Sequence, residues 1–297
     1  MGLKAPLTIA ESAEITTFGS IAVVSEKPFN TNDQFFRNEF TSENLANIHE
    51  GVTVCIGYTK DEGLLSLATG ANIEIKVHQF NNFYETYVPP SISWNCIIGD
   101  QLKFGQQIKK FYFDEKKIEV KDWLAMANFY ATYFFKYDIL HWIKTIKKLE
   151  KNNNVFLYKF GCVTERNIVT KMVGLQDVVK NESVVCHGDD LFYLFNVKGI
   201  EEKADMNLET FKVIDKVTKL WTNIAKYGDP TPDDSLGAKW LPYSNENKEY
   251  LNIENELQIG TALDALEFKH WNKTTILCAQ QILYFGSVFT GNDGTLV

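Results

Sequence analysis

The stretch VTVCIGYTKDEG, residues 52–63, decides the fold class because it leads an apolar run directly into a polar turn. The run from Val52 to Ile56 is rich in β-branched residues, which is typical of a strand inside a sheet. We expect the strand over residues 52–59, with Glu62 on the turn that follows it. Gly63 is then expected to let the chain turn sharply, because glycine tolerates backbone conformations that other residues avoid. A carboxylate is thereby placed just after a strand.

A second segment places a histidine after another strand. The apolar run VFLYKF, residues 155–160, predicts a strand over residues 154–162. His187 follows it in the motif CHGDDLF, residues 186–192. A histidine that takes a proton from a serine hydroxyl needs a buried carboxylate on its other ring nitrogen, which selects the tautomer and stabilises the imidazolium. Glu62 and His187 are the candidates for these two roles.

Two further acids lie close to His187 in the sequence, so the sequence does not decide which carboxylate orients the imidazole. Asp189 and Asp190 follow His187 by two and three residues, so either carboxylate is close enough in sequence to compete with Glu62. Asp is also a preferred residue at the start of a helix, where its side chain accepts backbone N–H groups. The alternative interpretation is therefore that Asp189 or Asp190 caps a helix that follows.

The order of these groups along the chain is typical of one reaction type. An acid and then a histidine, each after a strand, form the second part of the Ser–Glu–His order of an α/β-hydrolase. The serine of that order lies upstream in a G-x-S-x-G turn. No such pentapeptide occurs in the 297 residues, and neither does an H-G-G-G-like oxyanion loop. We therefore expect the chain to carry two of three catalytic groups and to show no ester turnover by itself.

Composition narrows the class of protein further. The formal net charge of −8 and the pI near 5.3 argue against a nucleic-acid partner, which needs a basic face. A hydrophobic share of 45% and a charged share of 23% are typical of a globular protein. The five cysteines form no C-x-x-C pair or cluster of zinc-binding spacing, so we expect no metal and no cofactor, while their spacing leaves the pairing of disulfides open. Cys55 and Cys162 lie within expected strands, where a free cysteine usually packs as a small hydrophobe.

Neither end of the sequence predicts export or a membrane anchor. Residues 1–6 lack the apolar stretch of a signal peptide. Residues 276–289 are apolar but interrupted by two glutamines, and they are fewer than the roughly 20 residues that span a bilayer. The tripeptides at Asn181 and Asn272 match glycosylation sequons, which matter only in a secreted protein. We expect no membrane partner.

In the rest of the chain, apolar runs typical of strands alternate with long helical patterns. This alternation predicts a layered α/β sheet in one compact unit. Helices are expected over residues 121–151 and 213–224, the second stopped by Gly228 and Pro230. The other expected elements are an extended segment at 18–30, a short helix at 42–49, surface loops at 81–99, an irregular segment at 164–183 and two short strands at 240–243 and 250–253. A complete sheet of this class has more strands than the sequence plainly shows.

The helix expected over residues 121–151 has a defined apolar stripe. Its members recur every three to five residues, which is the spacing of one helix face. The stripe consists of Trp123, Ala127, Tyr130, Phe134, Ile139, Trp142, Ile143, Ile146 and Leu149. Lysines follow the other face and the last turns, where positive charge favours the helix dipole.

Five segments in the same order resemble the type-B carboxylesterases, the family of the cholinesterases and insect esterases. They are GYTKDEGLL at 57–65, IKKFYF at 108–113, FLYKF at 156–160 followed by HGDDLFYLF at 187–195, LWTNIAKYGDP at 220–230 and WLPY at 240–243. The segment around His187 is most similar to insect carboxylesterases. The resemblance covers about residues 18–272, and residues 273–297 form a divergent tail. It implies that the chain, residues 1–297, is a partial α/β-hydrolase domain.

The resemblance implies the C-terminal half of an α/β-hydrolase fold, with a central, mostly parallel sheet flanked by helices. It implies Glu62 as the triad acid and His187 as the general base, while the nucleophilic serine and the glycine oxyanion donors of the family have no counterparts here. Val184 stands where many members have the glycine of G-x-x-H. The implied substrate is a small carboxylic ester, with no cofactor and no specific protein partner. For the full-length protein, the resemblance implies secretion.

An alternative function is a catalytically inactive, esterase-like module that binds a ligand or another protein. It follows from the absence of the G-x-S-x-G serine. The physical argument favours the hydrolase, because half of a doubly wound sheet exposes a long edge and an apolar face. We therefore interpret the chain as part of an ester hydrolase.

Overall fold

The computed structural model describes residues 48–68, 72–93, 96–149, 152–180, 182–196 and 208–275. The extended segment expected at residues 18–30 lies outside them, as does most of the short helix expected at residues 42–49. The last two residues of that expected helix, Ile48 and His49, are not helical.

The centre of the molecule is a four-stranded sheet in the order β1-β2-β3-β4. The strands are β1 (Val54–Thr59), β2 (Val155–Phe160), β3 (Glu249–Ile253) and β4 (Leu257–Thr261). The pairs β1–β2 and β2–β3 are parallel, and β3–β4 is antiparallel. The two strands expected at 52–59 and 154–162 are confirmed as β1 and β2. The expected α/β sheet, mostly parallel, is therefore present.

Of the two short strands expected at residues 240–243 and 250–253, only the second is present. Residues 250–253 lie in β3, which pairs with β4, but residues 240–243 have no regular secondary structure, and their contact with the sheet backbone is the hydrogen bond from the Tyr243 N–H to the Val155 carbonyl oxygen at 2.7 Å. Pro242 has no backbone N–H and cannot complete a strand ladder. The neighbouring Trp240 is buried, with its ring centroid 5.6 Å from that of Phe156. This segment therefore packs against the sheet instead of extending it.

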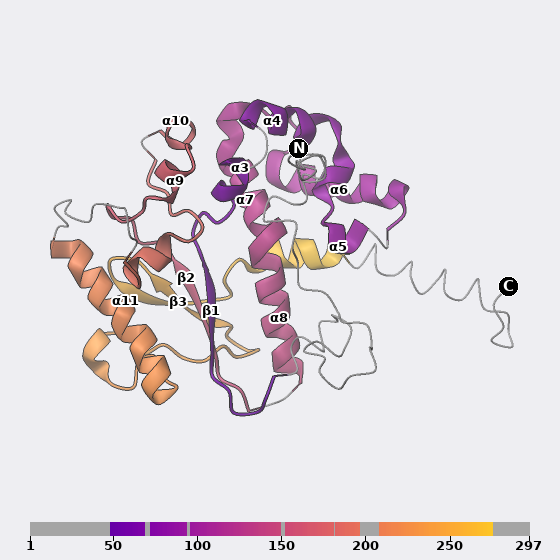
Figure 1. The fold of residues 1–297 in the computed structure, drawn as a ribbon. Helices are drawn as coiled ribbons and strands as arrows, with labels where there is room; N and C mark the ends of the chain where they lie inside the picture. The colour runs from indigo at the N-terminus through magenta and orange to yellow at the C-terminus, as the bar shows by residue number, and fades with distance from the viewer. Residues whose placement is uncertain are drawn as a thin grey trace, which may run out of the picture.

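One long helix covers each face of the sheet, as Figure 1 shows with α11 and α8 on opposite sides of the strands. The helix α11 (Leu208–Tyr227) buries Val213, Val217 and Leu220 against the sheet residues Phe156 and Leu251. On the opposite face, α8 (Tyr137–Lys148) packs against Tyr58, Val155 and Leu157 through the buried residues Leu140, Ile143 and Ile146. Both expected helices are confirmed. Their apolar stripes bury the two faces of one sheet.

The helical stretch before and including α8 is continuous but not uniform. It contains a 3-10 turn at Val120–Asp122, α7 (Trp123–Ala131) and a π-helical segment at Thr132–Lys136, and it continues directly into α8. The wider π turn changes which side chains face inward. Phe129 and Lys136 are buried, whereas Tyr130 and Phe134 of the expected stripe are only half-buried. The expected stripe is therefore confirmed for α8 and incomplete around α7, where Ala127 is buried as expected but the buried Met126 and Phe129 were left out of the stripe.

A second layer of helices packs at one end of the sheet. It contains α3 (Leu64–Ala68), α4 (Ile73–Asn82), a 3-10 turn at Tyr84–Tyr87, α5 (Pro90–Ser93) and α6 (Ile98–Phe113). The expectation that residues 81–99 loop over the surface is wrong. Tyr87 and Val88 are buried in one cluster with Phe80 and Phe129. Proline interrupts the helices here, but the large apolar area of the aromatic rings still drives the segment into the core.

Three smaller observations complete the fold. The expected irregular segment at 164–183 contains two single-turn helices, α9 (Val169–Met172) and α10 (Gln176–Val179). Cys55 and Cys162 are free thiols, as expected, and Cys96 is disulfide-bonded, a pairing that the sequence left open. Thiol pairing depends on spatial approach, which cysteine spacing does not show. Within the described residues, no helix has the length and apolarity needed to cross a membrane.

Candidate active site

The structure brings Glu62 and His187 together across 125 residues of sequence. Nδ1 of His187 lies 2.5 Å from Oε2 of Glu62. The Glu62 side chain is 6% exposed and the His187 side chain 41% exposed. A buried carboxylate therefore holds one nitrogen of an imidazole that remains open to solvent.

Both oxygens of the Glu62 carboxylate have a hydrogen-bond partner. Oε1 accepts the backbone N–H of Thr59, the last residue of β1, at 2.6 Å, while Oε2 meets His187. The first hydrogen bond fixes the carboxylate against the end of the strand. When Nδ1 of His187 donates to this carboxylate, the imidazole is held in the tautomer whose Nε2 can accept a proton.

Asp61 joins the acid turn to the histidine loop, a role that the sequence analysis did not identify. Its backbone N–H donates to the carbonyl oxygen of Val185 at 2.9 Å, and its Oδ2 accepts the Val185 N–H at 2.9 Å. Asp61 and Cys186 form an isolated parallel bridge, so the two loops continue the pairing of β1 with β2. The Asp61 side chain is buried, and that burial raises the pKa of its carboxyl. In the sequence, the only indication of this role was that Asp61 directly precedes Glu62.

Asp189 shapes the histidine loop from inside. Its two oxygens accept the backbone N–H groups of Cys186 at 2.7 Å and of Val169 at 3.1 Å. The residue has no exposed surface, and burial raises its pKa to about 6 although the backbone donors favour the charged form. Gly188, which lies between His187 and Asp189, adopts a φ of +83°, a left-handed conformation that favours glycine. Asp189 therefore fixes the turn that contains His187, because its carboxylate accepts backbone N–H groups from both the histidine loop and the start of α9.

Asp190 contacts a tyrosine of the sheet instead of the histidine ring. Its Oδ2 accepts the hydroxyl of Tyr158, in β2, at 3.1 Å. The alternative in which Asp189 or Asp190 orients His187 is thus not the arrangement in the structure, where Glu62 holds Nδ1. Both acids lie in the 3-10 helix Asp189–Tyr193, whose first turn has no side-chain cap, so the capping alternative is wrong as well.

Two further features of the site were missed or misread from the sequence. Phe135, in the π-helical segment, stacks on His187 with ring centroids 4.7 Å apart at an interplanar angle of 28°. The expected turn at Gly63 is present, closed by the hydrogen bond from the Leu64 N–H to the Asp61 carbonyl oxygen at 3.1 Å, but Gly63 does not have a positive φ, so the expected reason for the glycine is wrong. A Cβ at this position would overlap the carbonyl oxygen of Ala127 in α7. Gly63 is therefore explained by the close approach of helix and turn.

The hydrogen bond to Glu62 raises the pKa of His187 above its ordinary value; partial burial opposes this effect, and the charge of Asp190 adds to it. We expect Glu62→Gln to lower the pKa of His187, measured by NMR titration of its imidazole nitrogens. The exposed Glu246→Gln is the control and should leave that pKa unchanged. An unchanged pKa in Glu62→Gln contradicts the coupling of the two groups.

The same shift predicts the direction of a pH effect on stability. Because the folded pKa is raised, the pair stabilises the fold fully below the ordinary histidine pKa of about 6.5. The contribution is lost as the pH rises through the folded pKa. The difference in free energy of unfolding between the protein and Glu62→Gln, from urea denaturation at several pH values, should therefore shrink with rising pH.

In the described part of the chain, no group of three or more His, Cys, Asp or Glu side chains is arranged to hold a metal ion. What the site offers is an imidazole with one nitrogen held by a buried carboxylate, which is the arrangement of a general base.

A model of the carboxylesterase family matches residues 4–271 of the chain. Esterase FE4 of Myzus persicae is 26% identical over 198 residues, which are 65% of this chain and 33% of that protein. Juvenile hormone esterase of Tribolium castaneum is 24% identical over 259 residues, 82% of this chain and 43% of that protein. The chain thus spans less than half the length of each of these relatives.

A solved structure shows the same fold. The crystal structure of juvenile hormone esterase from Manduca sexta, with OTFP covalently attached, superposes with a TM-score of 0.66 at 17% sequence identity. The superposition covers 84% of this chain and 46% of that one. At this identity the likeness establishes the fold alone.

Proposed function

The chain belongs to the carboxylesterase family and has an α/β-hydrolase fold, and on that premise we propose that it supplies the acid and the base of a serine-type ester hydrolase. In this proposal Glu62 orients the imidazole and His187 is the general base. The observation that carries the proposal is the 2.5 Å contact between Oε2 of Glu62 and Nδ1 of His187. The second hydrogen bond of the carboxylate, from Thr59, supports a fixed orientation.

The proposed reaction follows from the chemistry of these two groups. Nε2 of His187 takes the proton of a serine hydroxyl while the serine oxygen attacks the ester carbonyl carbon. The imidazolium then gives this proton to the leaving alcohol, and an acyl-serine remains. Water attacks the acyl carbon in the second half, again with His187 as base, and the carboxylic acid is released. Glu62 stabilises the imidazolium in both halves.

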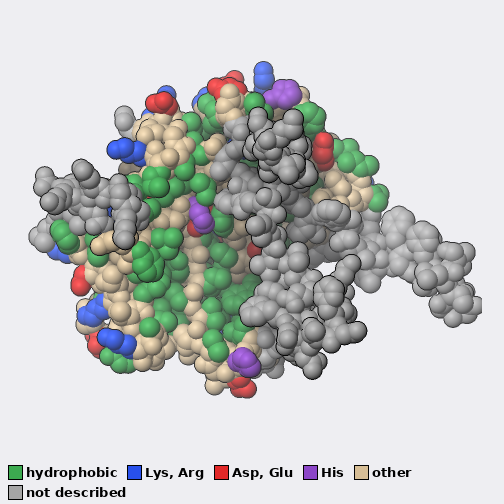
Figure 2. Space-filling model, viewed as in Figure 1, with side chains coloured by type: hydrophobic (Ala, Val, Ile, Leu, Met, Phe, Trp, Pro, Cys, Tyr) green, Lys and Arg blue, Asp and Glu red, His purple; other side chains and the backbone are tan. Residues whose placement is uncertain are grey.

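We propose that the nucleophile and the oxyanion donors belong to the part of the family's fold that this chain does not span. The sequence contains no G-x-S-x-G pentapeptide, and the aligned region covers 33% to 43% of the two curated relatives. Among the described strands, β1 pairs only with β2. Figure 2 shows hydrophobic side chains gathered in the centre of this face, over the strands between α11 and α8. An open edge flanked by apolar surface favours a covering segment.

The substrate class in this proposal is a small carboxylic ester. The names of the relatives, which include two esterases and a juvenile hormone esterase, support that class. We also propose an oxidising, extracytosolic compartment for the protein. The disulfide at Cys96 supports it, because disulfides persist mainly in such compartments.

We expect the purified 297-residue chain to hydrolyse 4-nitrophenyl acetate no faster than a Glu62→Gln, His187→Ala double variant. The full-length native transcript should extend in frame to a G-x-S-x-G segment, and its product should hydrolyse this ester and react covalently with a fluorophosphonate probe. Activity of the 297-residue chain that is lost in the double variant contradicts the proposed location of the nucleophile. A full-length transcript without the serine motif contradicts the proposal of an ester hydrolase and favours the alternative of a non-catalytic binding module.

A further inference from the structure

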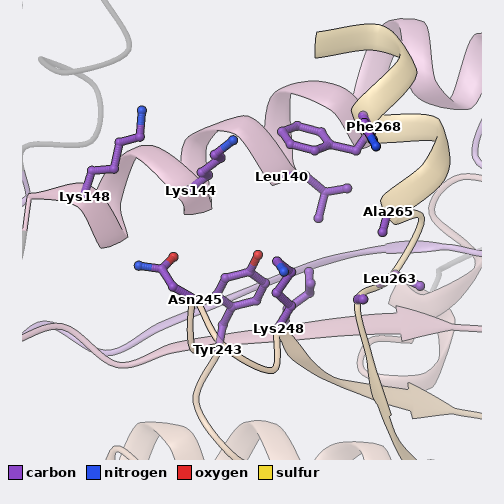
Figure 3. A pocket seen from close by; sticks show the side chains of 12 residues that line it. Leu140, Lys144, Lys148, Tyr243, Asn245, Lys248, Leu263, Ala265 and Phe268 are labelled. Carbon is purple, nitrogen blue, oxygen red and sulfur yellow. The ribbon is translucent and has the colours of Figure 1, made fainter. Parts of the chain in front are cut away.

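A cavity of about 550 Å³ lies on the α8 side of the sheet, and its lining shares no residue with the Glu62–His187 pair. It is enclosed by α8, by the turn before β3 and by the segment that follows β4 (Figure 3). A volume of this size is within the usual range for small-molecule sites, roughly 300 to 1,000 Å³.

The interior of this cavity is apolar. Leu157 of β2, Leu140 of α8 and Leu263 line it and are themselves buried, and the Phe268 ring lines it from the helix that begins at residue 265. Such a lining favours a hydrocarbon chain over water. It therefore suits the apolar part of a ligand.

The rim is positively charged. Four lysines from three different segments line the cavity, and its lining contains no Asp or Glu: the lysines are Lys144, Lys148, Lys248 and Lys269. Within the described part of the chain, none of the four forms an ion pair with a carboxylate. Lys148 also suits the negative end of the helix dipole in the last turn of α8, but Lys144 lies before that turn and the other two lysines come from separate segments. Such a concentration of positive charge stands out in a chain of net charge −8.

The positions of these groups define where an anion would lie. Figure 3 shows Lys144 above and Lys248 below the space beside α8, whereas Lys148 points away from it. The Nζ atom of Lys144 lies 5.6 Å from the ring centroid of Phe268. The hydroxyl of Tyr243 points into the same space, where it can donate a hydrogen bond. Cationic and polar donors thus lie on two sides of the same space, next to the apolar side chains of Leu140 and Phe268.

We propose that this cavity binds an amphipathic carboxylate, a molecule with one anionic head and a flexible alkyl chain. The alkyl chain lies against the leucines and Phe268, and the head is bound by Lys144, Lys248 and Lys269. A singly charged head suits the site better than a phosphate, because a doubly charged group loses more hydration free energy beside apolar walls. The lysine ammonium groups are mobile point charges and adapt to a carboxylate without a fixed geometry.

Decanoate tests the proposal, with decanamide as the uncharged analogue and acetate as the head without a chain. In titration calorimetry of the intact chain at pH 8, decanoate should bind at least ten times more tightly than decanamide, and acetate should show no measurable binding. The decanoate affinity should fall with added NaCl, and the decanamide affinity should not. Equal affinities for decanoate and decanamide overturn the proposal.

Two variants locate the binding. Lys144→Gln with Lys269→Gln should weaken decanoate binding at least tenfold and leave decanamide binding unchanged. Ala265→Phe, at an exposed lining position, should weaken both ligands by filling the cavity mouth. The exposed Lys226→Gln on α11 is the control and should have no effect. Unchanged decanoate binding in Ala265→Phe, with the fold intact by circular dichroism, places the ligand elsewhere and overturns the proposal.

Discussion

Replacing His187 with alanine is expected to lower the kcat of the complete ester hydrolase by roughly 10⁴- to 10⁶-fold, with a much smaller change in KM. The reason is that the imidazole acts on the proton of the nucleophile, which moves only on the way to the transition state, and contributes little to ground-state binding. Glu62→Gln keeps the shape of the side chain but removes the charge that stabilises the imidazolium. We expect it to lower kcat by roughly 10⁴-fold.

The measurement is steady-state hydrolysis of 4-nitrophenyl acetate by the product of the full-length transcript. The matched control is His78→Ala, which removes an exposed histidine of α4 and should leave kcat unchanged. A residual kcat within tenfold of the parent in His187→Ala contradicts the proposed base. A double variant at Glu62 and His187 should lose little more than His187→Ala alone, because the two residues act as one unit.

Gly63→Ala is expected to reduce the free energy of unfolding by about 3 kcal/mol or more. The added methyl group would overlap the backbone of α7 at Ala127 and Ala131, and a helix backbone cannot move aside as a flexible side chain can. The loss is large against a typical total stability of roughly 5 to 15 kcal/mol. Because Gly63 follows Glu62 directly, the displacement should also move the acid turn.

The measurement for this prediction is urea denaturation followed by circular dichroism. Gly99→Ala is the control: Gly99 lies in α6, and a Cβ there meets no atom within 4 Å. That change should be neutral or stabilising by up to about 1 kcal/mol, because alanine favours a helix. Equal stability of Gly63→Ala and Gly99→Ala would show that the approach of α7 does not constrain this position.

The sequence by itself determined those features that depend on local pattern. The apolar runs that became β1 and β2 and the stripes of α8 and α11 have the periodicity of a strand or of a helix face, which any compact fold must bury. The positions of Glu62 and His187, each after a strand, were readable for the same reason. His187 lies beyond α9 and α10, well past the end of β2, so strand order alone did not select Glu62 over Asp189 and Asp190 as its partner; the resemblance to the carboxylesterases implied that pair.

Only the tertiary structure decided what depends on contacts between distant segments. Asp61 forms hydrogen bonds with the histidine loop, Phe135 stacks on His187, and the absence of a side chain at Gly63 allows the backbone of α7 to approach closely. None of these contacts has a local sequence pattern. The buried Lys136 is a further example: it lies 3.4 Å from Asp264 and 3.5 Å from Glu267, and its burial became possible only with these two carboxylates beside it. Periodicity predicts which face of an element is apolar, whereas the partner of each side chain is set by how the elements pack.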